Sequence, residues 1–215
     1  NPHPGLDSAR SIIEQLAQGL QALHRREMLH QDLRPENVMI DHQGTVKLID
    51  LASAHVEGLA ECHRDALVTP VPGTLQYIAP EYLLGQGGSQ RSELFALAAI
   101  TYQMLTGQLP YGLDIARVRS PQDLRSLRYV PVRHHRPELP TWVDAVLAKA
   151  LQPDPARRQE VISEFIQDLK APGTQFKNPR TPPLIERNPV VFWQSATALL
   201  SLTVIALIAL RILER

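Results

Sequence analysis

The stretch that decides the fold is Leu29 to Asn37, LHQDLRPEN. Within six residues it contains a carboxylate (Asp32), a guanidinium (Arg34) and a carboxamide (Asn37), and Asp50 adds a second carboxylate further along. Phosphoryl transfer needs such groups: a carboxylate to orient the attacking hydroxyl, a cation near the transferred phosphate and oxygen ligands for Mg²⁺. These residues predict a metal site formed by Asn37 and Asp50, with Asp32 facing the substrate hydroxyl.

The sequence on either side of this stretch predicts a helix before it and a hairpin after it. We expect a helix from a cap at Asp7 to about Arg26, because apolar residues recur at helical spacing. Two extended runs, 38–40 and 45–49, flank a turn at 41–44 and predict a small hairpin. Since Asp50 follows the second run, the hairpin would bring Asp50 close to the catalytic stretch.

The remaining elements are predicted to be mostly helical. Leu51 to Gln76 has no sustained periodicity and is typical of a long functional loop. Ser92 to Thr106 is apolar on most sides and stops before Gly107, which predicts a central buried helix. Two amphipathic helices are expected at Thr141–Leu151 and Arg158–Leu169. The fold class is therefore mainly α, with the hairpin as its predicted β element.

Four motifs in order resemble those of one family. They are similar to HRDLKPEN, DFG, GTxxYxAPE and DPxxR, and they lie at His30–Asn37, Asp50–Ala52, Gly73–Glu81 and Asp154–Arg158. With a helix and a hairpin between them, they resemble the C-terminal lobe of a eukaryotic-type (Hanks-type) serine/threonine protein kinase, closest to the bacterial ones. The resemblance covers Gly5 to about Leu169.

The resemblance implies roles for the residues of the predicted site. Asp32 would be the catalytic base, or the residue that orients the substrate hydroxyl. Arg34 stands where a lysine usually contacts the γ-phosphate. Asn37 and Asp50 would hold Mg²⁺ or Mn²⁺, with ATP as the phosphate donor.

The resemblance makes Leu29–Asn37 the catalytic loop, and it also implies roles for three residues outside this loop. Gly73–Glu81 resembles the end of the activation segment, and Thr74 would lie beside Asp32 in its substrate-facing part, as in serine/threonine kinases. Glu81 and Arg158 would form a buried ion pair that ties this segment to the lobe. Such a pair contributes register more reliably than stability, although loss of one partner is costly.

Several positions depart from the family pattern without removing a catalytic group. Gln31 replaces an arginine, so no cation there can pair with an activation-segment phosphate, and we expect no activation by the usual phosphorylation. Ala52 replaces a glycine, which narrows the backbone options of that segment. Glu93 replaces an aspartate that braces the catalytic-loop backbone, and its extra methylene could shift the brace.

Several parts of a kinase are missing from the sequence. A kinase needs a glycine-rich loop over the phosphates and a strand lysine paired with a helix glutamate. No lysine occurs before Lys47, and the glycine-rich stretch Gly85–Gly88 has the wrong context for a nucleotide loop. We therefore expect the N-lobe to lie upstream of Asn1, where a metal-dependent phosphatase domain is also a candidate, as in some bacterial relatives.

The bulk composition excludes some classes of partner. Lys and Arg number 22 and Asp and Glu 22, so no basic footprint for nucleic acid is indicated. The single cysteine, Cys62, fits a reducing compartment. The start of the sequence lacks the pattern of a signal peptide.

The C-terminal part predicts a membrane anchor. Residues 171–189 are rich in proline and indicate a linker after the kinase lobe at 1–170. Residues 190–210 carry no charge, and as a helix they would be about 30 Å long, enough to cross the hydrocarbon core of a bilayer. A buried core helix is the alternative. Residues 211–215 would form a short tail, and the lobe would face the cytoplasm, where ATP is found.

Two functions remain open. The first is a membrane-anchored serine/threonine kinase that transfers the ATP γ-phosphate to hydroxyls of protein substrates, and the 215-residue piece alone would be inactive. The second is a membrane-tethered pseudokinase that binds and regulates a partner. The upstream residues would distinguish the two, because an enzyme needs the N-lobe groups.

Overall fold

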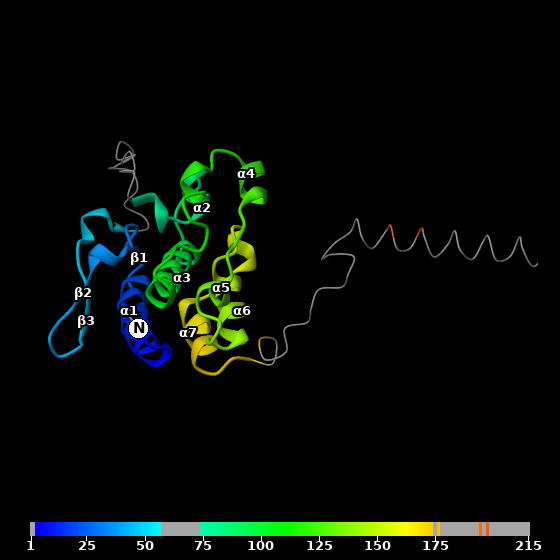
Figure 1. Ribbon diagram of the computed structural model, residues 1–215. Coiled ribbons are helices and arrows are strands. Elements are labelled where there is room, and N and C mark those ends of the chain that lie inside the picture. The colour runs from blue at the N-terminus through cyan, green and yellow to red at the C-terminus, as the bar shows by residue number, and fades with distance from the viewer. Residues whose placement is uncertain (1–2, 57–73, 174–175, 177–193, 195–196, 198–215) are drawn as a thin grey trace, which may run out of the picture. The chain divides into compact units, whose positions relative to one another are not determined.

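The computed structural model describes residues 3–56, 74–173, 176, 194 and 197. The chain divides into two compact units, Asn1–Asn178 and Pro179–Arg215. The first unit contains all the predicted site residues and is shown in Figure 1. The boundaries expected for the lobe, linker, membrane anchor and tail stay predictions, since the second unit lies almost wholly outside the described residues.

Helix α1 spans Leu6–His24 and carries one apolar face into the core. Its buried residues follow the helical spacing seen in the sequence: Ala9, Ile13, Leu16, Ala17 and Leu20. The expected cap at Asp7 is wrong. Gly5 occupies the cap position, while Asp7 lies in the first turn and forms an exposed ion pair with Arg10 at 2.9 Å. An acid in the first turn is still favourable because of the helix dipole.

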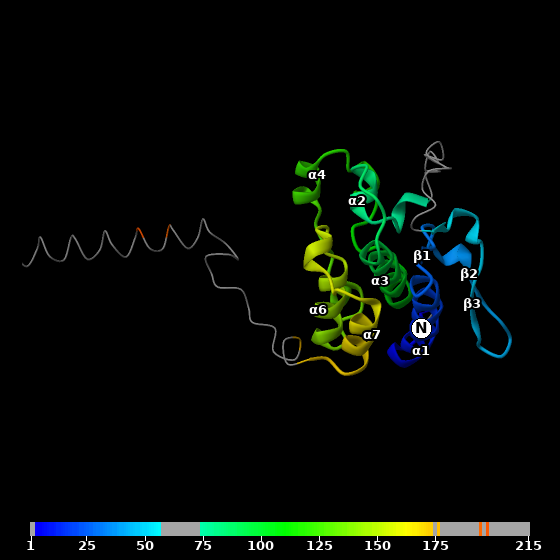
Figure 2. The ribbon, with the colours of Figure 1, turned by 180° about the vertical axis from the view of Figure 1, so that it is seen from behind.

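Helix α3, Gln90–Thr106, is the central helix of the first unit. It contacts α1, α6 (Thr141–Ala150) and α7 (Ile162–Lys170), and Figures 1 and 2 show it between α1 and α6. Nearly all of its residues are buried, as the apolar pattern predicts. It begins two residues before Ser92, because Ser89 and Ser92 form a capping box, and it ends at Gly107 with φ 71°.

The predicted hairpin is confirmed. Strands β2 (Val38–Ile40) and β3 (Val46–Leu48) are antiparallel, with Val38 opposite Leu48. Asp41 stabilises the turn, since its Oδ1 accepts from the backbone N–H groups of Gln43 and Thr45, both at 2.9 Å.

Gln15 of α1 holds this hairpin against the helix. Its Nε2 donates to the carbonyl of Gly44 at 3.2 Å, and its Oε1 accepts from the N–H of Val46 at 3.1 Å. One carboxamide therefore satisfies a donor and an acceptor at the end of the hairpin. This contact ties the hairpin, which lies between Asn37 and Asp50, to the first helix.

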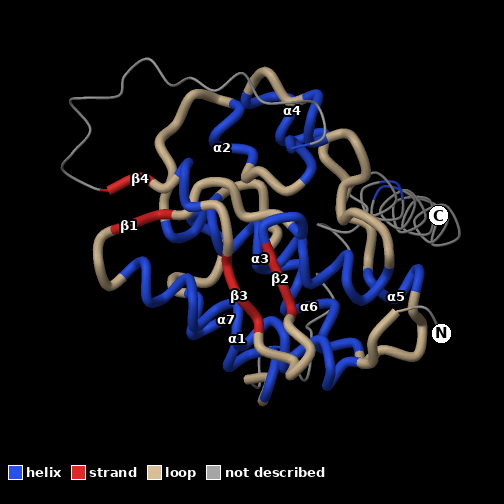
Figure 3. Tube along the Cα trace, turned by 90° about the vertical axis from the view of Figure 1, so that its left-hand side faces the viewer, coloured by secondary structure: helices blue, strands red, loops and turns tan. Residues whose placement is uncertain are grey.

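A second strand pair was not predicted. Strand β1 (Met28–Leu29) pairs antiparallel with β4 (His55–Val56), and Figure 3 shows both strand pairs. Each strand has two residues, too few for a periodic signal in the sequence. The pairing holds the start of the catalytic loop next to the segment after Asp50.

Short elements complete the lobe. Besides α2 (Pro80–Leu83), α4 (Pro121–Ser126) and α5 (Val132–His135), the single-turn helices are η1 (Pro35–Asn37), η2 (Leu51–Ser53), η3 (Thr74–Gln76), η4 (Ile115–Arg117) and η5 (Pro155–Arg157). The expected helix from Arg158 begins four residues later, at Ile162. Arg158 has an extended backbone, with φ −78° and ψ 173°, and not a helical one. In this conformation its side chain pairs with Glu81.

The structure does not describe a membrane helix. In the part of the chain that it covers, no helix is both long enough and apolar enough to cross a bilayer. The predicted span at 190–210 falls outside the described residues, apart from Gln194 and Thr197. The linker 171–189 and the tail 211–215 are outside them as well, except for residues 171–173 and Phe176.

Candidate active site

Glu93 of α3 holds the backbone of the catalytic loop in place through hydrogen bonds. Its side chain is 2% exposed, and Oε1 accepts hydrogen bonds from the backbone N–H groups of His30 and of Gln31, the latter at 3.0 Å. Its Oε2 lies 2.5 Å from Nε2 of His24, at the end of α1. The brace is therefore made despite the extra methylene, and it fixes the two amides that precede Asp32.

Asn37 holds Asp32 directly. The Nδ2 group of Asn37 donates to the Asp32 carbonyl at 2.7 Å and to Oδ2 of Asp32 at 2.9 Å. Pro35 at the first position of η1 pre-sets the turn that carries Asn37. With the amide nitrogen turned toward Asp32, the amide oxygen points the other way. Asn37 can therefore orient Asp32 and offer an oxygen ligand at the same time.

Asp50 follows β3 in a left-handed conformation. Its φ is 61° and its ψ 72°, and its Oδ1 accepts from the N–H of Ala52 at 3.3 Å. The preceding residue, Ile49, connects it to the catalytic loop: the Ile49 N–H donates to the Asn37 carbonyl at 3.0 Å, and the Ile49 carbonyl lies 3.2 Å from Nε2 of His30. The hairpin thus brings the neighbourhoods of Asn37 and Asp50 together, as the sequence predicts.

Arg34 is paired with a neighbour in its own loop. Its Nε donates to Oε2 of Glu36 at 2.8 Å, and its side chain is 23% exposed. This hydrogen bond raises the pKa of Arg34 and, conversely, lowers the pKa of Glu36. The negative charge of Asp32 raises the pKa of Arg34 further, so the guanidinium stays a cation beside the Asp32 carboxylate.

The end of the predicted activation segment reaches the same place. A small cavity of about 30 Å³ is lined by the catalytic loop, this segment and α3, with Gln31, Asp32, Tyr77, Ile78, Ala79 and Glu93 among its residues. The hydroxyl of Tyr77 donates to Oε1 of Gln103 on α3 at 2.5 Å. Thr74 begins η3, but its side chain lies outside the described residues, so its predicted place beside Asp32 stays a prediction.

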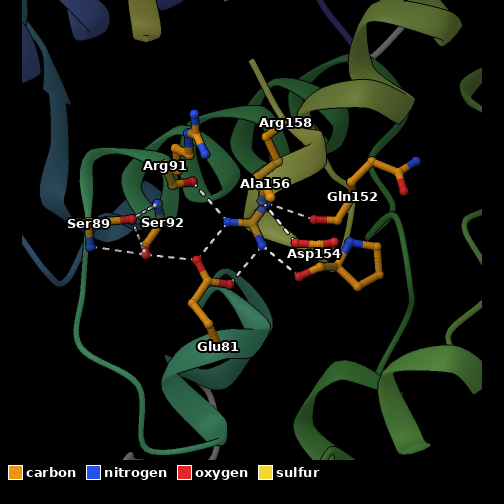
Figure 4. A network of polar contacts seen from close by, with 9 residues as sticks. Glu81, Ser89, Arg91, Ser92, Gln152, Asp154, Ala156 and Arg158 are labelled. Atoms are coloured by element: carbon orange, nitrogen blue, oxygen red, sulfur yellow. Dashed lines mark hydrogen bonds and ion pairs between the residues drawn. The ribbon is translucent and has the colours of Figure 1, made fainter. Parts of the chain in front are cut away.

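Glu81 and Arg158, expected to pair, form a two-pronged contact (Figure 4). Nη1 and Nη2 of Arg158 donate to the two oxygens of Glu81, each at 2.7 Å. The remaining donors of Arg158 go to the backbone carbonyls of Gln152, Arg91 and Pro153. The pair is buried, and the guanidinium also lies over the ring of Phe95, 4.8 Å from its centre.

Comparison with known proteins gives this arrangement a family. The protein kinase domain model matches residues 5–169, well over half of the chain. The chain belongs to the protein kinase family. This assignment agrees with the catalytic loop, hairpin and ion pair described above.

Three curated relatives of this kinase chain come from bacteria. It is 34% identical over 164 residues to the serine/threonine-protein kinase PknB of Mycolicibacterium smegmatis, covering 74% of this chain and 26% of the relative. It is 27% identical over 171 residues to the serine/threonine-protein kinase PrkC of Bacillus subtilis, covering 78% and 25%. A probable serine/threonine-protein kinase PknB of Bifidobacterium longum is 34% identical over 151 residues, covering 68% and 21%. The chain thus spans about a quarter of the length of these relatives.

One site residue of this kinase lobe escaped sequence reasoning. His24 lay within the predicted helix, and its own sequence neighbours did not indicate that its ring would contact Glu93, 69 residues later. The signal was an acidic residue in an otherwise apolar helix, which requires a buried partner. The sequence indicated the brace at Glu93 but not what completes it.

Proposed function

We propose that the full-length protein is a serine/threonine kinase that transfers the ATP γ-phosphate to hydroxyl groups of proteins. The observation that carries this proposal is the pair of hydrogen bonds from Asn37 to Asp32, next to a hairpin that ends in Asp50. Because the chain spans about a quarter of its curated relatives, the proposal concerns the longer protein. An N-lobe outside this sequence would supply the glycine-rich loop and the strand lysine.

The residues of the site fit a magnesium-dependent reaction. Asn37 and Asp50 would hold Mg²⁺ or Mn²⁺ through an amide oxygen and a carboxylate, the hard oxygen ligands that such ions prefer. When bound, the metal would neutralise charge on the phosphates of ATP. Asp32 would orient the substrate hydroxyl and accept its proton, while Asn37 keeps the Asp32 carboxylate in place. Arg34 would contact the transferred phosphate.

Regulation is proposed to differ from that of kinases with an arginine before the catalytic aspartate. Gln31 is neutral, so this position lacks the charge to order a phosphorylated activation segment. The backbone of Gln31 is instead fixed by Glu93, at φ 63°. We expect the full-length protein to be active without phosphorylation of that segment, and phosphatase treatment that abolishes activity would contradict this.

The decisive experiment follows phosphate incorporation from labelled ATP into a protein substrate by the full-length protein. We expect Asp32→Asn and Asp50→Ala each to lower incorporation by about 100-fold or more, the scale of a lost catalytic group. Asp7→Asn is the matched control, since Asp7 is 96% exposed on α1. Unchanged incorporation in both site variants would overturn the proposal, and a wild type that transfers no phosphate would favour the pseudokinase. The 215-residue chain alone should be inactive.

Membrane attachment is a separate proposal. Residues 190–210 form an uncharged apolar run long enough to cross a bilayer, which would leave the kinase lobe in the cytoplasm with ATP. Deletion of residues 190–215 should move the protein from the membrane fraction to the supernatant. The matched control replaces the run with an unrelated apolar sequence of equal length, which should keep the protein in the membrane. Retention after the deletion would contradict the proposal.

A further inference from the structure

His24 and Glu93 form a buried polar contact under the catalytic loop. Nε2 of His24 lies 2.5 Å from Oε2 of Glu93, and the side chains are 7% and 2% exposed. A buried carboxylate needs hydrogen-bond partners for both oxygens, because water cannot supply them. His24 supplies the partner for one oxygen, and the catalytic loop supplies the partners for the other.

The second oxygen of Glu93 is what reaches the catalytic loop. Oε1 accepts from the N–H groups of His30 and Gln31, immediately before Asp32. A glutamate side chain has several rotatable bonds and considerable rotamer entropy, so one contact alone leaves its other oxygen poorly oriented. The histidine ring fixes Oε2 from the end of α1. Oε1 is then held where the two amides can both reach it.

The connection continues to the other half of the site. Nε2 of His30 lies 3.2 Å from the carbonyl of Ile49, the residue before Asp50. A shift of the His30 backbone would therefore change the relation between the catalytic loop and the strand that carries Asp50. His24 itself contacts the other oxygen of Glu93, Oε2.

We propose that His24 is a positioning residue, which acts through Glu93 to hold the amides of His30 and Gln31 and thereby the Asp32 carboxylate. The catalytic consequence rests on the proposed kinase function. The structural part does not, because it concerns contacts within the folded lobe. The two parts can be tested separately in the full-length protein.

The structural test is hydrogen exchange of the catalytic-loop amides. We expect His24→Leu to accelerate exchange in a peptide covering residues 28–34 by about tenfold, because the loop opens locally more often. His24→Gln should restore protection, since its amide nitrogen can also donate to Glu93. The control is His134→Leu, a change of the same type at an exposed position on α5. No acceleration in His24→Leu, or equal acceleration in α7, would overturn the proposal.

The catalytic test separates kcat from KM. We expect His24→Leu to lower kcat about 10- to 100-fold, the effect of a small misplacement of a reacting group, with the KM for ATP changed less than about twofold. In a Glu93→Ala background, the same substitution should lower kcat less than about twofold further, because the two residues act as one unit. Full additivity of the two substitutions would overturn action through Glu93.

The outcomes distinguish this inference from the proposed function. A wild-type protein without kinase activity would refute the function, whereas faster loop exchange in His24→Leu would still support the positioning role. An active wild type whose loop exchange and kcat are unchanged by His24→Leu would refute the positioning role alone. Recovery of both readouts in His24→Gln would support a hydrogen-bonding role for the ring over mere packing.

Discussion

Glu81 and Asp50 are carboxylates in the same lobe, but their oxygens are used differently. Both oxygens of Glu81 accept from Arg158, Oε1 also accepts from Ser92 at 2.8 Å, and the side chain is 5% exposed. Asp50 is exposed, and one oxygen accepts a weak bond from Ala52 at 3.3 Å. The first carboxylate is saturated by protein donors, while the second is left accessible to a ligand.

This difference distinguishes carboxylates that stabilise the fold from carboxylates that are available to a ligand. A saturated, buried pair contributes mainly to register and leaves an uncompensated charge if one partner is lost. An exposed carboxylate in a left-handed conformation contributes little packing and is more consistent with ligand binding. We therefore expect substitutions around Glu81 to lower the free energy of unfolding strongly, and substitutions at the β2–β3 hairpin to lower it little.

The largest effect is expected at Arg158. Arg158→Met leaves Glu81 buried without its cation and should lower the free energy of unfolding by about 3–5 kcal/mol, measured by urea denaturation. The double variant with Glu81→Met should be clearly more stable than the single one, because no charge is then stranded. Arg157→Met is the control, since Arg157 is 74% exposed. A double variant as unstable as Arg158→Met would contradict this explanation.

A smaller effect is expected at Gly88, which lies against Tyr82, the residue after Glu81. A Cβ at Gly88 would lie 2.0 Å from the hydroxyl oxygen of Tyr82, so the ring must move. Gly88→Ala should lower the melting temperature, with a loss of about 1–3 kcal/mol. Gly87→Ala is a matched control, because a Cβ there meets nothing within 4 Å. Equal melting temperatures for the two variants would show that Tyr82 is loosely held.

The hairpin should tolerate change better. Gln15→Leu removes two hydrogen bonds to Gly44 and Val46, and we expect a loss of about 1 kcal/mol in the free energy of unfolding. The loss should be local, so exchange of the hairpin amides should accelerate more than exchange in α3. Gln18→Leu, at an exposed position on the same helix, should leave the hairpin amides unchanged. If Gln15→Leu lowered the free energy of unfolding as much as Arg158→Met, the expected order of the two effects would be contradicted.

The smallest effect concerns a third carboxylate, Asp168. It is 6% exposed, its Oδ2 accepts a hydrogen bond from Nε2 of the neutral Gln159 at 3.3 Å, and burial raises its pKa. A raised pKa in the folded state means that stability from this group is present at low pH and lost as the pH rises through the folded pKa. Asp168→Asn should therefore stabilise the protein at pH 7 by about 0.5–1 kcal/mol.

The pH dependence gives the check on Asp168. The gain from Asp168→Asn should shrink as the pH falls toward 4, because the wild-type carboxyl then becomes neutral too. Gln159 should add to the gain at pH 7. Its Oε1 is buried without a hydrogen-bond partner among the described residues, and an asparagine at position 168 could donate to it. Melting temperatures of the wild type and Asp168→Asn at pH 7 and pH 4 measure the gain in stability at each pH. A larger gain at pH 4 than at pH 7 would contradict a raised pKa of Asp168.

Sequence reasoning worked best where local chemistry decides the structure. The hairpin follows from a turn built on Asp41, and the end of α3 follows from Gly107, whose positive φ suits glycine. It was wrong where a tertiary contact overrides a local preference. The helix expected from Arg158 starts at Ile162, because the arginine takes an extended backbone to reach Glu81. The pairing of β1 with β4 joins segments too short to show a pattern.

By itself, the sequence determined the chemical groups of the LHQDLRPEN loop, their order and the elements on either side of it. Motif spacing and helical periodicity are properties of neighbouring residues, so they can be read without a fold. The tertiary structure alone decided that His24 completes the contacts of Glu93 and that Asn37 turns its amide nitrogen to Asp32. Those contacts depend on how α1, α3 and the hairpin pack. The direction of a side chain is set by that packing and not by its neighbours in the chain.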